Sequence, residues 1–365
     1  MQLLSRSLIV LSAGVMLSTT ALADEEKIVN IYNWSDYIAE DTIENFEAET
    51  GIKVRYDVFD SNEVLEAKLL AGNTGYDIVV PTSSFMARQI QAGVFAPLDK
   101  SKLPNWKNLD KDILARLDQQ DPGNKYGMPY MWGTTGFAYN INKIKERMPD
   151  APTGSWDMLF NPEVVKNFAD CGVTLLDAPT EVFDAALNYL GKDPNGHDKD
   201  ALEDATEMLT KVRPYIKYFH SSQQINDLAN GDICLAMGWS GDMFIARDRA
   251  DEAEQGVEIE YVIPSEGALI WFDMMTIPAD APHPDNAHAF LNYMMKPEVA
   301  AGVSNYVWYA NANAAATELV DEEITSDPAI YPPEEVKSKL FPDLTEPPRY
   351  TRLVTRAWTK VKTGQ

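Results

Sequence analysis

The chain has 365 residues and a formal net charge of −25, from 56 acidic residues against 31 Lys and Arg. Such a charge repels nucleic acid and anionic lipid and favours cationic partners. The length is sufficient for two domains, each with its own hydrophobic core.

The first residues have the pattern of an export signal. Arg6 precedes an apolar run from Leu8 to Leu17, and Ala21-Leu22-Ala23 has the small-x-small spacing of a cleavage site. The run is too short, and too rich in Ser and Thr, for a membrane span. We therefore expect residues 1–23 to be a signal peptide, with no later segment that crosses a membrane.

Strand and helix patterns alternate after this signal. Strands are predicted over residues 27–33, 53–59 and 75–81, and helices over 40–50, 62–71 and 84–92. Such repetition predicts an α/β fold with a mostly parallel sheet flanked by helices. Ligands of these sheets bind at the carboxyl ends of the strands.

The middle of the chain changes character. Residues 126–140 are aromatic, Gly-rich and predicted to be extended, as in a segment that crosses between two lobes. A second α/β region follows, with strands over 173–179 and 233–242 and helices over 182–190 and 200–211. Residues 261–278 predict a pair of strands that leads back to the first lobe, and residues 284–302 an amphipathic helix that stops at Gly302.

Two cysteines, Cys171 and Cys234, remain in the exported part of the chain. In an exported protein an even pair suggests a disulfide. A metal site is the weaker alternative, because no CxxC or HxxxH motif accompanies them. We expect no metal and no cofactor.

The ends of the predicted strands share a composition of aromatic rings, hydroxyls and carboxylates. The candidate ligand-binding residues are Trp34, Ser35, Asp36, Tyr37, Thr82, Ser84, Asp177, Glu181, Trp239, Asp242, Trp271, Asp273 and Tyr309. Arg and Lys are absent from these stretches, which argues against a site for an anion. Aromatic faces and carboxylates together suit a slender cation with several charges.

Several of these residues also have ordinary structural interpretations. Asp36 could cap a helix, Glu181 could be an acid favoured in a first helical turn, and Asp242 could close a turn. Catalytic motifs are absent, and we predict no catalytic residue. A secreted hydrolase built on paired carboxylates remains the alternative from a different functional class.

Several segments resemble the periplasmic polyamine-binding proteins of ABC importers. They are NIYNWSDYI, GYDIVVPTSSF, LLDAPTEVF, AMGWSGD, WFDMMTIP, NAHAFLNYMMKPEVAA and WYANAN. The resemblance implies two lobes, which we place at residues 24–133 plus 271–317 and at residues 134–270 plus 318–365. It further implies a hinge near residues 132–136 and 261–271, closure on a polyamine, and delivery to a membrane permease in the periplasm of a Gram-negative bacterium. We expect a monomer that binds no nucleic acid.

The resemblance also implies roles for individual residues. Trp34, Trp239, Trp271 and Tyr309 match aromatic walls. Ser35, Asp36 and Thr82 match polar contacts, Asp273 an acid that binds one terminal ammonium, and Glu181 and Asp242 acids toward the other end. Ser84 and Asp177 match variable positions. Cys171 and Cys234 match a disulfide of close relatives.

Within this resemblance, the prediction of which polyamine is preferred rests on one aromatic position. The position of Trp271 tends to be Phe in putrescine binders and Trp in spermidine binders, although much of the remaining sequence resembles the putrescine branch. We therefore expect spermidine preference, with a putrescine-preferring binder as the alternative.

Overall fold

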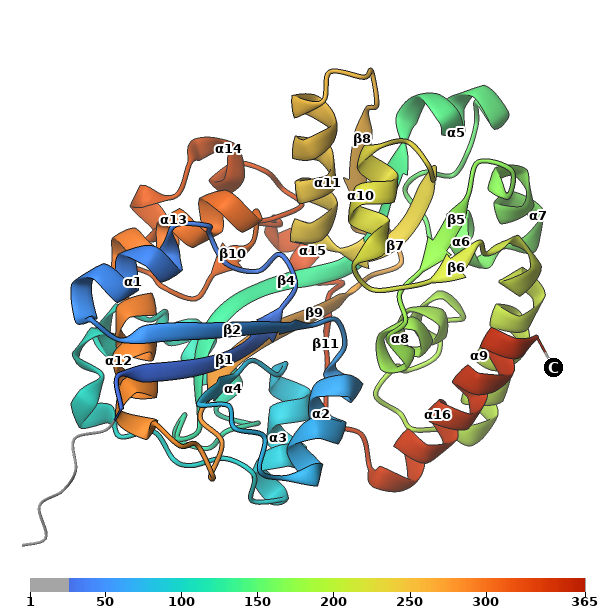
Figure 1. Cartoon of the computed structure of the whole chain (residues 1–365). Coiled ribbons are helices and arrows are strands. Elements are labelled where there is room, and N and C mark those ends of the chain that lie inside the picture. The colour runs from blue at the N-terminus through green and yellow to red at the C-terminus, as the bar shows by residue number, and fades with distance from the viewer. Residues whose placement is uncertain (1–25, 365) are drawn as a thin grey trace, which may run out of the picture.

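The computed structural model describes residues 26–364, so the predicted signal peptide lies outside the described residues. One mixed sheet runs through the whole fold and joins two lobes (Figure 1). The strands are β1 (Ile28–Trp34), β2 (Lys53–Phe59), β3 (Ile78–Val79), β4 (Gly127–Asn140), β5 (Val173–Leu175), β6 (Tyr218–Phe219), β7 (Leu235–Trp239), β8 (Ile259–Val262), β9 (Leu269–Thr276), β10 (Ala310–Asn311) and β11 (Phe341–Pro342).

Helices cover the sheet in both lobes (Figure 1). They are α1 (Thr42–Thr50), α2 (Asn62–Ala71), α3 (Ser83–Gln91), α4 (Lys111–Leu117), α5 (Ile141–Arg147), α6 (Asp157–Phe160), α7 (Pro162–Val165), α8 (Pro179–Tyr189), α9 (Lys199–Val212), α10 (Gln223–Ala229), α11 (Ser240–Glu252), α12 (Pro284–Met294), α13 (Pro297–Val307), α14 (Glu322–Thr325), α15 (Glu334–Lys337) and α16 (Pro348–Thr363). In the described part of the chain no helix is both long and apolar enough to span a bilayer.

The first lobe contains the parallel βα repeat that the sequence predicts. β1 pairs in parallel with β2 on one side and with β3 on the other, with Ile31 opposite Ile78. β3 is shorter than predicted. Because parallel strands end at one edge of the sheet, the residues after β1, β2 and β3 gather there.

Two long strands carry the sheet from one lobe to the other. Residues 127–135 of β4 pair antiparallel with β9, while residues 135–140 pair antiparallel with β7 and β8. β8 and β9 therefore both pair with β4 and not with each other, unlike the predicted strand pair. A Cβ at Gly136 would overlap the Val262 carbonyl oxygen, so only glycine allows β8 to approach there.

The second lobe repeats the parallel arrangement around β5, which pairs with β6 and β7. The Cys171–Cys234 disulfide is present and confirms the predicted pairing. It links the residues that precede β5 and β7 across a sequence separation of 63. Closing such a loop stabilises a fold by about 4 kcal/mol in the chain-entropy model.

The helix predicted over residues 284–302 is two helices, α12 and α13. Lys296 has the extended conformation that a following proline imposes, and Pro297 then begins α13. Gly302 does not stop this helix. α13 continues to Val307 and ends at Trp308, which takes the left-handed conformation.

The C-terminal segment forms a further connection between the lobes. β11 pairs with β9, and Thr345 donates a hydrogen bond to the Ser84 carbonyl oxygen in the first lobe. α16 then packs against α8 and α9 of the second lobe (Figure 1). The lobe boundaries stay a prediction.

Candidate functional site

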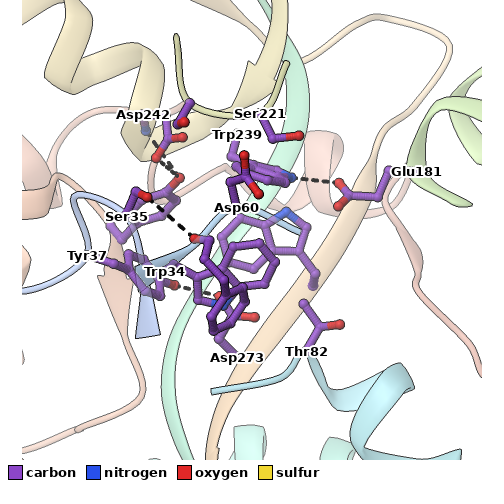
Figure 2. A pocket seen from close by; sticks show the side chains of 14 residues that line it. Trp34, Ser35, Tyr37, Asp60, Thr82, Glu181, Ser221, Trp239, Asp242 and Asp273 are labelled. Carbon is purple, nitrogen blue, oxygen red and sulfur yellow. Dashed lines mark hydrogen bonds between the residues drawn. The ribbon is translucent and has the colours of Figure 1, made fainter. Parts of the chain in front are cut away.

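A cavity lies between the lobes at the ends of the strands (Figure 2). Its lining residues come from both lobes and include most of the predicted candidates. They are Trp34, Ser35, Tyr37, Phe59, Asp60, Thr82, Glu181, Ser221, Ser222, Trp239, Asp242, Trp271, Asp273 and Tyr309. No Lys, Arg or His is among them.

Aromatic rings from both lobes form the walls of the cavity. Trp34 packs against Phe59 with ring centroids 4.6 Å apart and meets Trp239 edge-on at 5.3 Å. The indole N–H of Trp34 donates to the Val80 carbonyl oxygen at 2.8 Å, which fixes the ring. Tyr309 contacts Trp271 at 5.5 Å and Tyr37 at 5.1 Å. The rings are therefore held by one another before any ligand arrives.

Two glycines make room for these rings. A Cβ at Gly133 would lie 2.8 Å from the outer ring of the Trp271 indole and 2.8 Å from the Ser240 hydroxyl. A Cβ at Gly241 would overlap the Tyr309 ring itself. The positions of Trp271 and Tyr309 therefore depend on glycine, which has no side chain, at Gly133 in β4 and at Gly241 in α11.

Asp273 is the buried acid on the first side of the cavity. It lies two residues after Trp271 on β9, so both side chains point to the same face of the sheet. Its Oδ2 accepts a hydrogen bond from the Tyr37 hydroxyl at 2.8 Å, whereas its Oδ1 has no partner among the described residues. Burial, followed by nearby acids including Glu181, raises the pKa of Asp273 well above its ordinary range.

Two further acids come from helices of the second lobe. Glu181, in the first turn of α8, accepts hydrogen bonds from the Thr135 hydroxyl at 2.6 Å and the Trp239 indole N–H at 2.7 Å. Asp242, in the first turn of α11, accepts one from the Tyr309 hydroxyl at 2.9 Å. Burial raises the pKa of Glu181 to about 7 and that of Asp242 to about 8.

The arrangement favours a cation over any other ligand. Three buried carboxylates face one cavity whose lining offers them no cationic partner, and an uncompensated buried charge is costly. A ligand with ammonium groups would supply the missing charges and donate to the free carboxylate oxygens. The rings would cover its methylene groups and contribute cation–π attraction.

The structure places three candidates outside the cavity lining. Asp36 does not line the cavity and does not cap α1, whose N-cap is Asp41. The Asp36 carboxylate instead pairs with Arg249 at 2.6 Å. Ser84 donates a hydrogen bond to the Asp343 carboxylate. Asp177 accepts hydrogen bonds from the Trp358 indole at 2.8 Å and from Lys362 at 2.9 Å.

Four lining residues were not predicted from the sequence. Phe59 and Asp60 follow β2, and Ser221 and Ser222 precede α10. Phe59 and Asp60 lie at a strand end like the other candidates. The expectation that ligands bind at the carboxyl ends of strands, applied to β2, would therefore have selected them. No local pattern marks the two serines.

Residues 41–332 match the model of a family described as bacterial extracellular solute-binding protein. The chain belongs to this family. Membership identifies the chain as a binding protein and not an enzyme, so the alternative of a hydrolase built on paired carboxylates is not supported.

Individual relatives and solved structures agree with this membership. The chain is 56% identical to the putrescine-binding periplasmic protein PotF of Escherichia coli, covering 98% of this chain and 97% of that protein. It is 53% identical to the putrescine-binding periplasmic protein SpuD of Pseudomonas aeruginosa, with both chains fully covered (100%). It is also similar to the spermidine/putrescine-binding periplasmic protein of E. coli, with 35% identity over 90% of each chain.

The solved structure of a putative spermidine/putrescine ABC transporter from Listeria monocytogenes has the same two-lobed fold. It superposes with a TM-score of 0.83 and 38% identity over 93% of this chain and 100% of that one.

Proposed function

We propose that this chain captures putrescine in the periplasm and delivers it to an ABC permease. The observation that carries the proposal is the cavity itself, where Asp273 of the first lobe and Glu181 and Asp242 of the second lobe line one space together with aromatic rings. A diamine has one ammonium for each side and an apolar chain for the rings between them.

The choice of putrescine replaces the spermidine preference expected from Trp271. The relatives at 56% and 53% identity are named as putrescine binders, whereas the spermidine/putrescine binder is 35% identical. The geometry at Trp271 supports the same choice. The outer ring of its indole lies over Gly133, so part of the extra volume of a tryptophan is accommodated by the sheet and not by the cavity.

The proposal assigns ligand contacts to the residues that line the cavity. Asp273 takes one ammonium with its free Oδ1, and the carboxylates of the second lobe, Asp242 and Glu181, are the partners available to the other. Trp34, Trp239, Trp271 and Tyr309 enclose the methylene chain, and Ser35, Tyr37 and Thr82 complete the wall of the first lobe.

Isothermal titration calorimetry on ligand-stripped protein tests this function. Putrescine should bind at least tenfold more tightly than spermidine, and an anionic ligand such as glutamate should not bind. Spermidine binding tenfold more tightly than putrescine would restore the preference inferred from Trp271. Absence of binding by either polyamine would overturn the proposal altogether.

A further inference from the structure

Asp60 differs from the other carboxylates of the cavity. Asp273, Glu181 and Asp242 are at least nine-tenths buried, and each accepts a hydrogen bond from the protein. Asp60 is only half-buried. Among the described residues it makes no hydrogen bond and no ion pair.

The backbone on both sides of Asp60 is fixed. The carbonyl oxygen of the preceding Phe59 accepts a hydrogen bond from the Ser35 N–H at 3.0 Å, which ties the ends of β1 and β2 together. The following Ser61 caps α2 by accepting a hydrogen bond from the Val64 N–H at 3.2 Å. Asp60 therefore stands at a rigid junction on the first-lobe wall.

The second lobe contributes Ser221 and Ser222 to the same cavity lining (Figure 2 labels Asp60 and Ser221). Ser221 accepts a hydrogen bond from the Asp177 N–H at 3.1 Å, and the Ser222 N–H donates to His220 Nδ1 at 3.1 Å. Both serines are thus held in place. Their hydroxyl oxygens are acceptors of the kind that an ammonium group needs.

The charges of the site do not require Asp60 for a diamine. Two ammonium groups already have three buried carboxylates, one of which, Asp273, has an oxygen without a partner. A nearby cation to consider as a partner for Asp60 is Lys68, whose Nζ lies 4.8 Å from the centroid of the Tyr32 ring. Among the described residues, Lys68 lies over the rings of Tyr32 and Tyr76 and forms no ion pair with Asp60.

We infer that Asp60, with Ser221 and Ser222 opposite, is a specificity-determining residue that binds a third cationic group. The inference rests on the proposed function and names which polyamines the site admits beyond a diamine. A triamine such as spermidine has one amine more than a diamine. Its two outer amines would pair with the buried carboxylates, and Asp60, which a diamine leaves unused, would pair with the third amine.

Calorimetry on Asp60→Asn tests this role, with Glu44→Gln as a matched control that removes one exposed acid of the same lobe. Asp60→Asn should weaken spermidine binding at least tenfold and putrescine binding less than threefold, while Glu44→Gln should change neither. Equal losses for both ligands, or no loss for spermidine, would overturn the inference. Wild-type protein that binds no polyamine would instead overturn the proposed function, so the two failures are distinguishable.

Discussion

At the scale of single residues, the buried acids of the cavity oppose stability in the empty protein. Asp273 is 3% exposed, and burial disfavours its ionised form. Such a group is retained at a cost to the fold when its charge is needed for a ligand. Binding and stability should therefore respond in opposite directions when the charge is removed.

Asp273→Asn should weaken putrescine binding while it stabilises the ligand-free protein. The lost charge-assisted hydrogen bond in a closed site corresponds to roughly 2–4 kcal/mol of binding free energy. Calorimetry measures the affinity, and thermal unfolding without ligand should show a raised Tm. The exposed Glu207→Gln is the control, with neither quantity changed. An unaltered affinity in Asp273→Asn would show that this carboxylate does not contact the ligand.

The raised pKa values of Glu181, about 7, and Asp242, about 8, predict that binding releases protons. The ligand favours the ionised carboxylates and lowers their pKa, so affinity should fall as the pH is lowered from 8 to 6. The same two groups should make the ligand-free protein more stable against unfolding as the pH is lowered from 8 to 6. The reason is that the folded state binds protons in this range that the unfolded state does not bind.

Titrations in buffers of different ionisation enthalpy at pH 7 measure this proton release directly. A binding enthalpy that does not depend on the buffer, together with an affinity that is constant from pH 6 to 8, would contradict the assignment.

The sequence predicted three of the four carboxylates that line the cavity and missed the fourth, Asp60. Strand-end position and chemistry suffice to select Asp273 and Glu181. They do not exclude Asp36, Ser84 or Asp177, whose partners Arg249, Asp343 and Lys362 lie 213, 259 and 185 residues away along the chain. Those contacts depend on the packing of distant segments, which no local pattern contains.

At the scale of elements, short-range chemistry explains where prediction succeeded. β2 and α2 have the predicted limits because Ser61 caps the helix and Gly72 follows its last residue. The division of residues 284–302 was missed although Pro297 marks it, because the amphipathic pattern continues across the proline. The pairing of β8 and β9 with β4 is a matter of topology, which periodicity does not encode.

Gly241→Ala tests whether element packing positions the aromatic wall. The added methyl group would force Tyr309 away from its place beside Asp242, so putrescine binding should weaken at least tenfold. The control is Gly302→Ala in α13, where a Cβ meets nothing within 4 Å. That exchange should leave binding unchanged and should stabilise the fold by about 0.5–1 kcal/mol.

Circular dichroism of both variants should match the wild type. Retained affinity in a folded Gly241→Ala would show that the position of the Tyr309 ring does not matter for binding.

At the scale of the whole molecule, we expect closure of the lobes to depend on the ligand. The Asp36–Arg249 ion pair joins the predicted lobes at 2.6 Å, but its side chains are 37% and 34% exposed. A pair so exposed to water contributes at most about 1 kcal/mol. A ligand that contacts both lobes binds the closed state more tightly and shifts the population toward it.

Small-angle X-ray scattering should show this shift. Addition of saturating putrescine should reduce the radius of gyration of the ligand-stripped protein, as expected for a hinge at residues 132–136 and 261–271. Asp273→Asn at the same putrescine concentration should show a smaller reduction. Identical profiles for wild-type protein with and without putrescine would contradict a hinged closure.

The central claim is that a diamine lies between the two groups of carboxylates, and a crystal structure of the putrescine complex tests it most directly. We expect one ammonium within hydrogen-bond distance of Asp273 Oδ1, the other against a carboxylate of the second lobe (Asp242 or Glu181), and the methylene chain between the aromatic rings. Putrescine bound outside this cavity, or a cavity occupied by an anion, would contradict the account.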